Sequence, residues 1–327
     1  MIIIAFTSPC SGGPHARQVA SSAVRPEPAV GKEKAKGSTA ERRLFLSPAL
    51  ILVGLVTQVA FLVTIVFSML SWNLVRPDLG IHFVGLSNYS TLLSSTGFLT
   101  ALLNTITLTI GVLIAGMVIG LLLALLLNRT FPGRAVVRTL LITPFFVMPV
   151  ATAEIWKNML LNPVFGLFAW LVQQVGLTPP DILTSNPLIG VGIMLTWEWF
   201  PFFMLILLGG LQSLPEDLIE AAHIDGAGYW AIFRNITIPH LQRYIALATL
   251  FGLIYLLGVF GEIYVATQGG PGDSSTTLPF LIYRTAFDNW DIGVAAALGV
   301  IAVLITIAIA TGFNRVLLRM TNYAEAQ

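Results

Sequence analysis

Long apolar runs, separated by short polar segments, make up most of this chain. Six of them are long enough to cross a hydrocarbon core of about 30 Å, which takes about 20 helical residues. The pattern therefore predicts an all-α, polytopic membrane protein with six transmembrane helices. These runs cover residues 44–72, 98–128, 134–160, 187–212, 241–267 and 291–314.

A shorter apolar run, residues 164–176, follows the third predicted span. It is too short to cross and contains Gln173 and Gln174. We therefore expect it either to lie at the outer interface or to pack as a re-entrant piece. In the second span, Gly116 and Gly120 have GxxxG spacing, which predicts close helix packing.

The pattern changes between the fourth and fifth runs, where polar and apolar residues mix at helical spacing. Ser213 and Glu216 form a capping-box pattern with Pro215 between them, which predicts a helix start. Gly226 predicts the end of that helix, and a second amphipathic turn follows before Pro239. This segment should therefore hold two short helices joined by a glycine turn.

Composition agrees with a membrane protein and narrows its chemistry. Of the 327 residues, 56% are hydrophobic and 10% charged, and the mean hydropathy is +0.84. The single Cys10 excludes an internal disulfide and a cysteine metal cluster, and the four histidines are scattered along the chain. The sequence thus predicts no metal and no redox chemistry.

Basic residues orient the predicted spans. Loops rich in Lys and Arg stay on the cytoplasmic side, so both termini and residues 213–240 are predicted to be cytoplasmic. The opposite side carries only Arg76 and Arg284, and Lys157 lies inside a predicted span. The basic residues that set this orientation are Arg17, Arg25, Lys32, Lys34, Lys36, Arg42, Arg43, Arg129, Arg134, Arg138, Arg234, Arg243, Arg315 and Arg319.

The chain divides into three expected parts. Residues 1–43 are rich in Ser, Pro, Gly, Ala and Lys without periodicity, which predicts a disordered cytoplasmic tail. The opening MIIIAF lacks a preceding positive region and is too short for a secretory signal. Residues 44–320 form the expected six-helix domain, with a cytoplasmic loop at 213–240, and residues 321–327 a short cytoplasmic tail.

The segment from Glu220 to Pro239 carries a recognisable spacing. Glu220 is followed by Ala221 and Ala222, then by Gly226 after three residues, and the segment closes on Pro239. This spacing resembles the signature loop of the permease subunits of bacterial ABC importers. The residues alone are also consistent with an amphipathic hairpin that lies at the membrane interface.

This resemblance implies a type I ABC importer permease fold in the inner membrane and a role for the loop. In that family the loop is the coupling helix, which seats in a cleft of a separate ATP-hydrolysing subunit. Two small alanines allow close approach of another surface, while Glu220 and Asp225 offer acceptors, and glycine reverses the chain without strain. The implied ATPase-coupling residues are Glu220, Ala221, Ala222, Asp225, Gly226, Phe233 and Pro239.

Residues 267–297 offer a second resemblance. Gly269, Gly270 and Pro271 form an expected sharp outer turn, and Thr276 and Thr277 follow. This segment is similar to the carbohydrate-uptake branch of those permeases, in which the related protein is the larger membrane subunit of the maltose permease. An ordinary outer loop would also use such turn residues.

Motifs for an enzyme are missing. No phosphate-binding GxxxxGK[ST] loop, nucleophile elbow, paired-histidine zinc motif or kinase signature occurs in the sequence. We therefore expect no catalytic residue and no cofactor in this chain, with ATP and Mg²⁺ bound by partner ATPase subunits, as the resemblance implies.

Acidic and aromatic residues at membrane depth mark candidate solute contacts. A charge there costs about 2.5–3.5 kcal/mol on insertion scales and is usually turned inward. Aromatic faces beside carboxylates suit sugar rings, whose C–H faces are apolar and whose hydroxyls need acceptors. The candidate substrate-binding residues are Trp197, Glu198, Trp199, Phe202, Tyr255, Glu262 and Glu154.

Each acid also has another explanation. Glu154 can pair with Lys157 on one helix face. The tryptophans beside Glu198 can belong to an interfacial belt. Glu262 lies close enough to the Gly269 turn to reach outer water.

Together these features predict the permease subunit of an ATP-driven importer for a sugar, sugar alcohol or small glycoside. The expected partners are a second homologous permease that forms a heterodimer with it, two ATPase subunits and an extracytoplasmic binding protein. Two other classes stay open: a secondary transporter driven by an ion gradient, and a non-transporting membrane subunit that only docks a cytoplasmic partner.

Overall fold

The computed structural model describes residues 39–325, and nearly all of its regular structure is helical. Residues 1–38, which hold most of the expected tail, and residues 326–327 lie outside the described residues. The chain divides at residue 54 into two units. The described part of the first unit is the start of helix α1 (Thr39–Ser68), so residues 39–43 are helical rather than part of a tail.

Four helices of the described chain are each long and apolar enough to cross a membrane. The other two expected spans, 134–160 and 241–267, are broken. The first of these becomes a fifth crossing if its two bent halves count as one span. The four helices are Ser47–Ser68 within α1, α3 (Thr96–Asn128), α8 (Pro187–Gln212) and Ile292–Phe313 within α14 (Ile292–Glu325).

Proline breaks the third expected span. Val147 and Met148 are extended, because the residue before Pro149 avoids the helical region and proline itself lacks an N–H. The two halves meet at 98°. They comprise α4 (Arg134–Ile142) with the 3-10 helix η2 (Thr143–Phe146), and α5 (Pro149–Glu154) with the π-helix η3 (Ile155–Leu160).

Glycines mark the break in the fifth expected span. It consists of α11 (Ile238–Leu256) and α12 (Gly261–Ala266), which four non-helical residues separate. Gly258 lies within this break and Gly261 opens α12, in keeping with the low helix propensity of glycine. The break places the start of α12 next to α5 and α8.

Helices α3 and α8 form the main helix pair of the second unit. A Cβ atom on Gly116 would lie 2.7 Å from the Phe203 ring, and one on Gly120 would lie 2.8 Å from the Met204 backbone nitrogen. Only glycine permits this approach, so the close packing predicted from the GxxxG spacing is confirmed.

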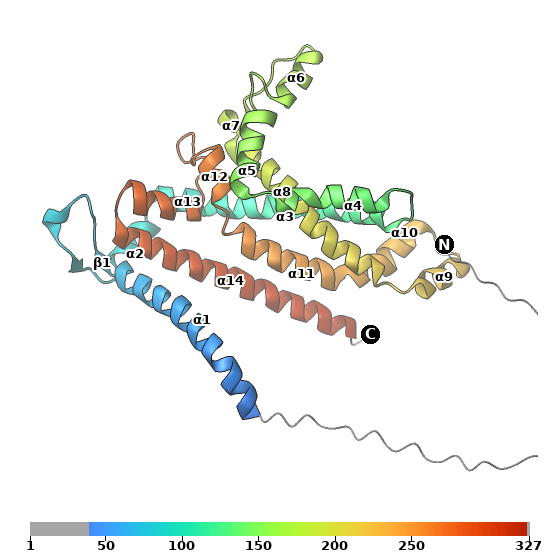
Figure 1. Ribbon diagram of the computed structural model, residues 1–327, viewed down its shortest axis with the longest axis horizontal. Helices are drawn as coiled ribbons and strands as arrows, with labels where there is room; N and C mark the ends of the chain where they lie inside the picture. The colour runs from blue at the N-terminus through green and yellow to red at the C-terminus, as the bar shows by residue number, and fades with distance from the viewer. Residues whose placement is uncertain (1–38, 326–327) are drawn as a thin grey trace, which may run out of the picture. The chain divides into compact units, whose positions relative to one another are not determined.

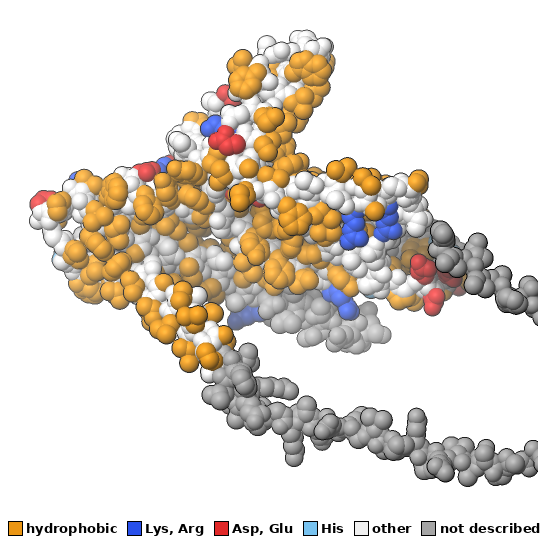
Figure 2. Space-filling model, in the orientation of Figure 1, with side chains coloured by type: hydrophobic (Ala, Val, Ile, Leu, Met, Phe, Trp, Pro, Cys, Tyr) orange, Lys and Arg blue, Asp and Glu red, His pale blue; other side chains and the backbone are white. Residues whose placement is uncertain are grey.

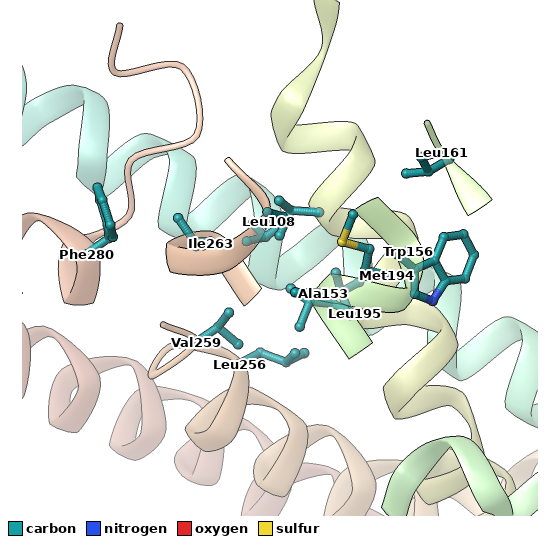
Figure 3. Close-up of a cluster of buried hydrophobic side chains, with 13 residues drawn as sticks. Leu108, Ala153, Trp156, Leu161, Met194, Leu195, Leu256, Val259, Ile263 and Phe280 are labelled. Carbon is teal, nitrogen blue, oxygen red and sulfur yellow. The ribbon is translucent and has the colours of Figure 1, made fainter. Parts of the chain in front are cut away.

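The largest buried cluster lies where α3, α5, η3, α8, α11 and α12 meet. Figure 3 shows Ala153, Met194, Leu195 and Ile263 at this junction, and each of these side chains is fully buried. Two further clusters occupy the ends of the unit. One lies around α13 and α14, and the other around the C-terminal ends of α3 and α8 with Leu241 of α11.

Short elements connect these helices. The run 164–176 forms α6 (Leu167–Gln174), whose large side chains are exposed and which projects beyond η3 in Figure 1. Its interfacial or re-entrant placement stays a prediction. The remaining elements are β1 (Leu70–Ser71) paired antiparallel with β2 (His82–Phe83), the 3-10 helix η1 (Pro77–Leu79), α2 (Ser87–Leu93), α7 (Ile182–Ser185), α13 (Leu278–Tyr283) and the π-helix η5 (Arg284–Asp288).

Candidate functional site

The 213–240 loop has the predicted helix–turn–helix form. Helix α9 (Glu216–Ile224) ends at Gly226, whose φ of +81° suits glycine, and α10 (Tyr229–Ile232) follows. The π-helix η4 (Phe233–Thr237) then leads into α11. The prediction of two short helices joined by a glycine turn is therefore confirmed.

The predicted capping box is wrong, although the helix starts where expected. Pro215 is the N-cap of α9, and no side chain bonds to the first N–H groups. The Ser213 hydroxyl instead donates to the Gly210 carbonyl at 2.8 Å and contacts Tyr244 Oη at 2.7 Å and His240 Nε2 at 3.0 Å. Ser213 faces back toward α8 and α11 because it still belongs to the C-cap of α8.

The 213–240 loop exposes large apolar side chains. Ile224 is 86% exposed, and Tyr229 and Trp230 are each 71% exposed. Acidic side chains gather over α9, and basic ones lie nearby over the start of α4 (Figure 2). Apolar groups in such a number on one loop indicate a surface that a partner covers.

The predicted coupling residues lie on this exposed loop. Glu220, Ala221, Asp225, Gly226 and Pro239 are exposed. Ala222 and Phe233 are half-buried, and the Phe233 ring stacks on Trp230 with centroids 5.4 Å apart. The structure thus brings all seven residues into one segment, and their coupling role stays a prediction.

Five aromatic rings from three elements form a second surface, which we call the aromatic surface. Trp199 contacts Phe145 and Tyr255 with ring centroids 5.7 and 5.4 Å apart, and Phe145 stacks on Phe202 at 5.6 Å. Tyr255 is 58% exposed, so the surface is open on this side. Its members are Phe145 of η2, Trp199 and Phe202 of α8, and Phe251 and Tyr255 of α11.

Two of the predicted acids are buried beside each other. Glu198 of α8 is 6% exposed and Glu262 of α12 is 3% exposed. Their side chains lie next to each other, with the buried Thr152 of α5 beside them. These acids therefore lie where three helices meet inside the protein, and the suggestion that Glu262 reaches outer water is wrong in this structure.

The remaining candidates lie elsewhere. Trp197 packs on Trp156 at 5.9 Å and faces away from the aromatic surface, since successive helical residues point about 100° apart. Glu154 is exposed and bonds to Asn158. The suggested pair of Glu154 with Lys157 does not form, because Lys157 Nζ donates to the Val265 carbonyl at 2.9 Å.

The 267–277 loop is fixed by internal hydrogen bonds. Asn104 Nδ2 of α3 donates to the carbonyls of Asp273 and Thr276 at 2.9 and 3.0 Å. Asp273 also forms a 2.7 Å ion pair with Arg284. Ser275 and Thr276 are fully buried, so this loop is a rigid part of the fold.

Several residues of these sites escaped the sequence analysis. Phe145 and Phe251 belong to the aromatic surface, and the four-residue spacing from Phe251 to Tyr255 was the available signal for the second of them. Ser213, His240 and Tyr244 meet only because α8 and α11 pack together, and no local spacing indicates such a contact.

Comparison with known proteins places the chain in a family. Residues 116–322 match the model of the family described as binding-protein-dependent transport system inner membrane component. A probable ABC transporter permease protein, y4oQ of Sinorhizobium fredii, is 36% identical over 266 residues, which cover 81% of this chain and 86% of the relative. The trehalose/maltose transport system permease protein MalF of Thermococcus litoralis is 32% identical over 228 residues, 69% of this chain and 77% of the relative.

A solved structure shares the fold. The bacterial ABC transporter involved in the import of alginate superposes with a TM-score of 0.72 at 24% identity, covering 86% of this chain and 97% of that one. Together with the long apolar helices, these matches describe a multi-pass inner-membrane protein with the type I permease fold, as the signature spacing indicated. The chain therefore belongs to the family of inner-membrane components of binding-protein-dependent transport systems.

Proposed function

We propose that this chain is one of two homologous permease subunits in an ATP-driven importer for a sugar, sugar alcohol or small glycoside. Two separate ATPase subunits bind ATP and Mg²⁺, and this chain holds no cofactor. An extracytoplasmic binding protein delivers the solute. Both termini and the 213–240 loop face the cytoplasm.

One observation carries the proposal: the exposed 213–240 loop connects the two helices that carry four of the five rings of the aromatic surface. The loop connects α8 to α11 directly. Trp199 and Phe202 lie on α8, and Phe251 and Tyr255 lie on α11. A displacement of the loop by a partner therefore acts on helices that also carry the proposed solute contacts.

The aromatic surface suits a polyhydroxylated solute. The rings of Trp199, Phe202 and Tyr255 offer apolar faces for the C–H side of a sugar, and the exposed tyrosine adds a hydroxyl. Relatives support this class by their names, since one is a trehalose/maltose permease and another, from Brucella suis, an sn-glycerol-3-phosphate permease. The buried Glu198 and Glu262 position α8 and α12 behind this surface instead of touching the solute.

The exposed apolar groups of the 213–240 loop support docking to an ATPase. Ile224, Tyr229 and Trp230 supply contact area, and Glu220 and Asp225 supply acceptors. Closure of the ATPase subunits on ATP moves the loop, and the two permeases rock between inward-facing and outward-facing states. The solute passes from the binding protein to the aromatic surface and then to the cytoplasm.

The test uses the complete importer in proteoliposomes. The cognate binding protein is first screened by thermal shift against sugars, polyols and glycerol phosphate, and the best ligand is then used for uptake. We expect uptake only with ATP inside and with the ligand-loaded binding protein outside. Replacing both Trp199 and Tyr255 with alanine should reduce uptake at least about fivefold, the loss of two aromatic contacts of ~0.5–1.5 kcal/mol each.

Three results would overturn parts of this proposal. Uptake driven by an ion gradient without the ATPase subunits would favour a secondary transporter. A complex that hydrolyses ATP and never moves a solute would favour a docking subunit. Unchanged uptake by the Trp199→Ala/Tyr255→Ala variant would remove the aromatic surface from the solute path.

A further inference from the structure

Three polar side chains meet where the 213–240 loop joins the membrane helices. We propose that Ser213, His240 and Tyr244, here called the Ser213 clamp, are positioning residues for energy coupling. They fix the two ends of the loop to each other, so that α8 and α11 carry its displacement to the aromatic surface as one body. This inference rests on the proposed function of the loop.

The hydrogen bonds of the clamp are mutually consistent. The Ser213 hydroxyl gives its one proton to the Gly210 carbonyl at 2.8 Å. Its oxygen then accepts from Tyr244 Oη at 2.7 Å and from His240 Nε2 at 3.0 Å. The same histidine nitrogen lies 3.1 Å from the Gly210 carbonyl. Each bond joins the end of α8 to the start of α11 or closes the last turn of α8.

Ser213 itself is exposed, and close packing is found beside it, around the Tyr244 ring. A Cβ atom on Gly210 would lie 2.6 Å from the Tyr244 ring and 2.8 Å from Leu241. Glycine at this position lets α11 lie directly against the α8 backbone. Leu211 and Leu241 are buried beneath the clamp in the same apolar cluster as Met204 and Leu207.

The clamp is aligned with the aromatic surface along both helices. Ser213 follows Phe202 by 11 residues, and Tyr255 follows Tyr244 by 11 residues. At 1.5 Å per residue, both distances are about 16 Å. The clamp and the aromatic surface therefore lie about three helical turns apart on α8 and on α11 alike.

Hydrogen bonds fix the geometry between α8 and α11, which apolar contacts alone do not. Apolar contacts hold helices together without direction, whereas hydrogen bonds fix distance and angle. Without the clamp, a displacement of the loop separates the end of α8 from the start of α11 and does not reach the aromatic surface. With the clamp, the same displacement shifts both helices together.

The experiment measures solute imported per ATP hydrolysed by the complete importer in proteoliposomes. Tyr244→Phe removes one hydroxyl and keeps the ring against Gly210, and Ser213→Ala removes the central oxygen. We expect normal assembly and retained ATP hydrolysis, with the import ratio reduced about fivefold, the factor equivalent to one hydrogen bond of ~1 kcal/mol. Ser213→Thr keeps the hydroxyl and should restore the ratio.

A matched control exists in the same chain. Tyr89 Oη and Ser68 Oγ form another serine–tyrosine hydrogen bond, 2.6 Å long and more buried than that of the clamp, between α2 and the end of α1, away from the loop. Tyr89→Phe should leave the import ratio unchanged. The ratio is taken per assembled complex, so a change in the amount of protein does not obscure it.

Three outcomes would overturn the clamp. The first is a normal import ratio in a Ser213→Ala/Tyr244→Phe double variant. The second is an equal loss of ratio in Tyr89→Phe, and the third is a reduced ratio in Ser213→Thr. Failure of the proposed function would look different, because the unaltered importer would then show no ATP-dependent uptake at all.

Discussion

Two glycine-containing polar loops of this protein have opposite constructions. The 213–240 loop turns large apolar side chains such as Ile224 and Trp230 outward. The 267–277 loop turns the hydroxyls of Ser275 and Thr276 inward, and Asn104 of α3 holds its backbone. Both interrupt apolar sequence, and both contain a glycine with positive φ.

The two loops differ in whether their polar groups and apolar side chains find partners within the chain. In the 267–277 loop, the carbonyls of Asp273 and Thr276 and the buried hydroxyls of Ser275 and Thr276 find partners within the chain, so these groups are satisfied without another protein. In the 213–240 loop, apolar area stays exposed, and only a second surface removes it from water. The first loop is therefore part of the fold, and the second exposes the surface that we propose as an interface.

The sharpest test of this comparison replaces one glycine in each loop with alanine. Gly269 has a φ of +78° and Gly226 a φ of +81°, so the backbone cost of about 1–2 kcal/mol is shared. At Gly269 the new Cβ would also lie 2.5 Å from Thr276 Oγ1 and 2.6 Å from Phe280, whereas nothing lies within 4 Å at Gly226. Overpacking should add about 1–3 kcal/mol at Gly269.

Unfolding of the purified protein in detergent measures this difference. We expect Gly269→Ala to lower the free energy of unfolding by about 3–4 kcal/mol and Gly226→Ala by about half as much. Equal losses in the two variants would contradict the view that only the 267–277 loop is packed internally.

A smaller effect is expected from Asn104→Ala. This change leaves the carbonyls of Asp273 and Thr276 without their side-chain donor, which should cost about 2 kcal/mol of unfolding free energy. Asn158→Ala removes an exposed contact with Glu154 and serves as the control, with a change within about 0.5 kcal/mol. The same detergent unfolding measurement applies.

Polar substitution on the 213–240 loop should separate function from stability. The double variant Ile224→Ser/Trp230→Ser should unfold normally and lose about tenfold in ATP-dependent uptake, equivalent to ~1.4 kcal/mol of docking energy. Leu79→Ser changes another exposed apolar residue, outside this loop, and should preserve uptake. Normal uptake by the double variant would argue against an interface on the loop.

The smallest effect should come from Arg129→Ala. Arg129 Nη2 donates to Tyr229 Oη at 3.3 Å, and the contact is exposed. Water replaces such a bond readily, so we expect unfolding free energy to change by less than about 0.5 kcal/mol. A loss above 1 kcal/mol would show that the 213–240 loop is held internally more firmly than its exposure indicates.

Apolar periodicity predicted the helical fold well and its interruptions poorly. The runs that became α3 and α8 match their predicted spans within a few residues. Residues 134–160 and 241–267 were each predicted as one span. The structure instead has a 98° bend before Pro149 and a break before Gly261. Proline and glycine there were visible in the sequence, yet their effect depends on which neighbouring helices fill the gap.

The two candidate sites also differ in how well the sequence predicted them. The signature spacing from Glu220 to Pro239 located the 213–240 loop because its residues are contiguous. The solute residues were harder, because Trp197, Glu198 and Trp199 are adjacent in sequence and point in three directions on one helix. Which direction is open depends on the packing of α3, α12 and η2, which no local pattern contains.

The separation between the aromatic surface and the loop has a practical consequence for protein engineering. No residue of the aromatic surface lies within residues 213–240, although α8 and α11 link the two regions. Under the proposed function, specificity would be redesigned at positions 145, 199, 202, 251 and 255 while the ATPase-docking loop is kept unaltered. A library confined to those five positions should then yield importers for new solutes that still work with their original ATPase subunits.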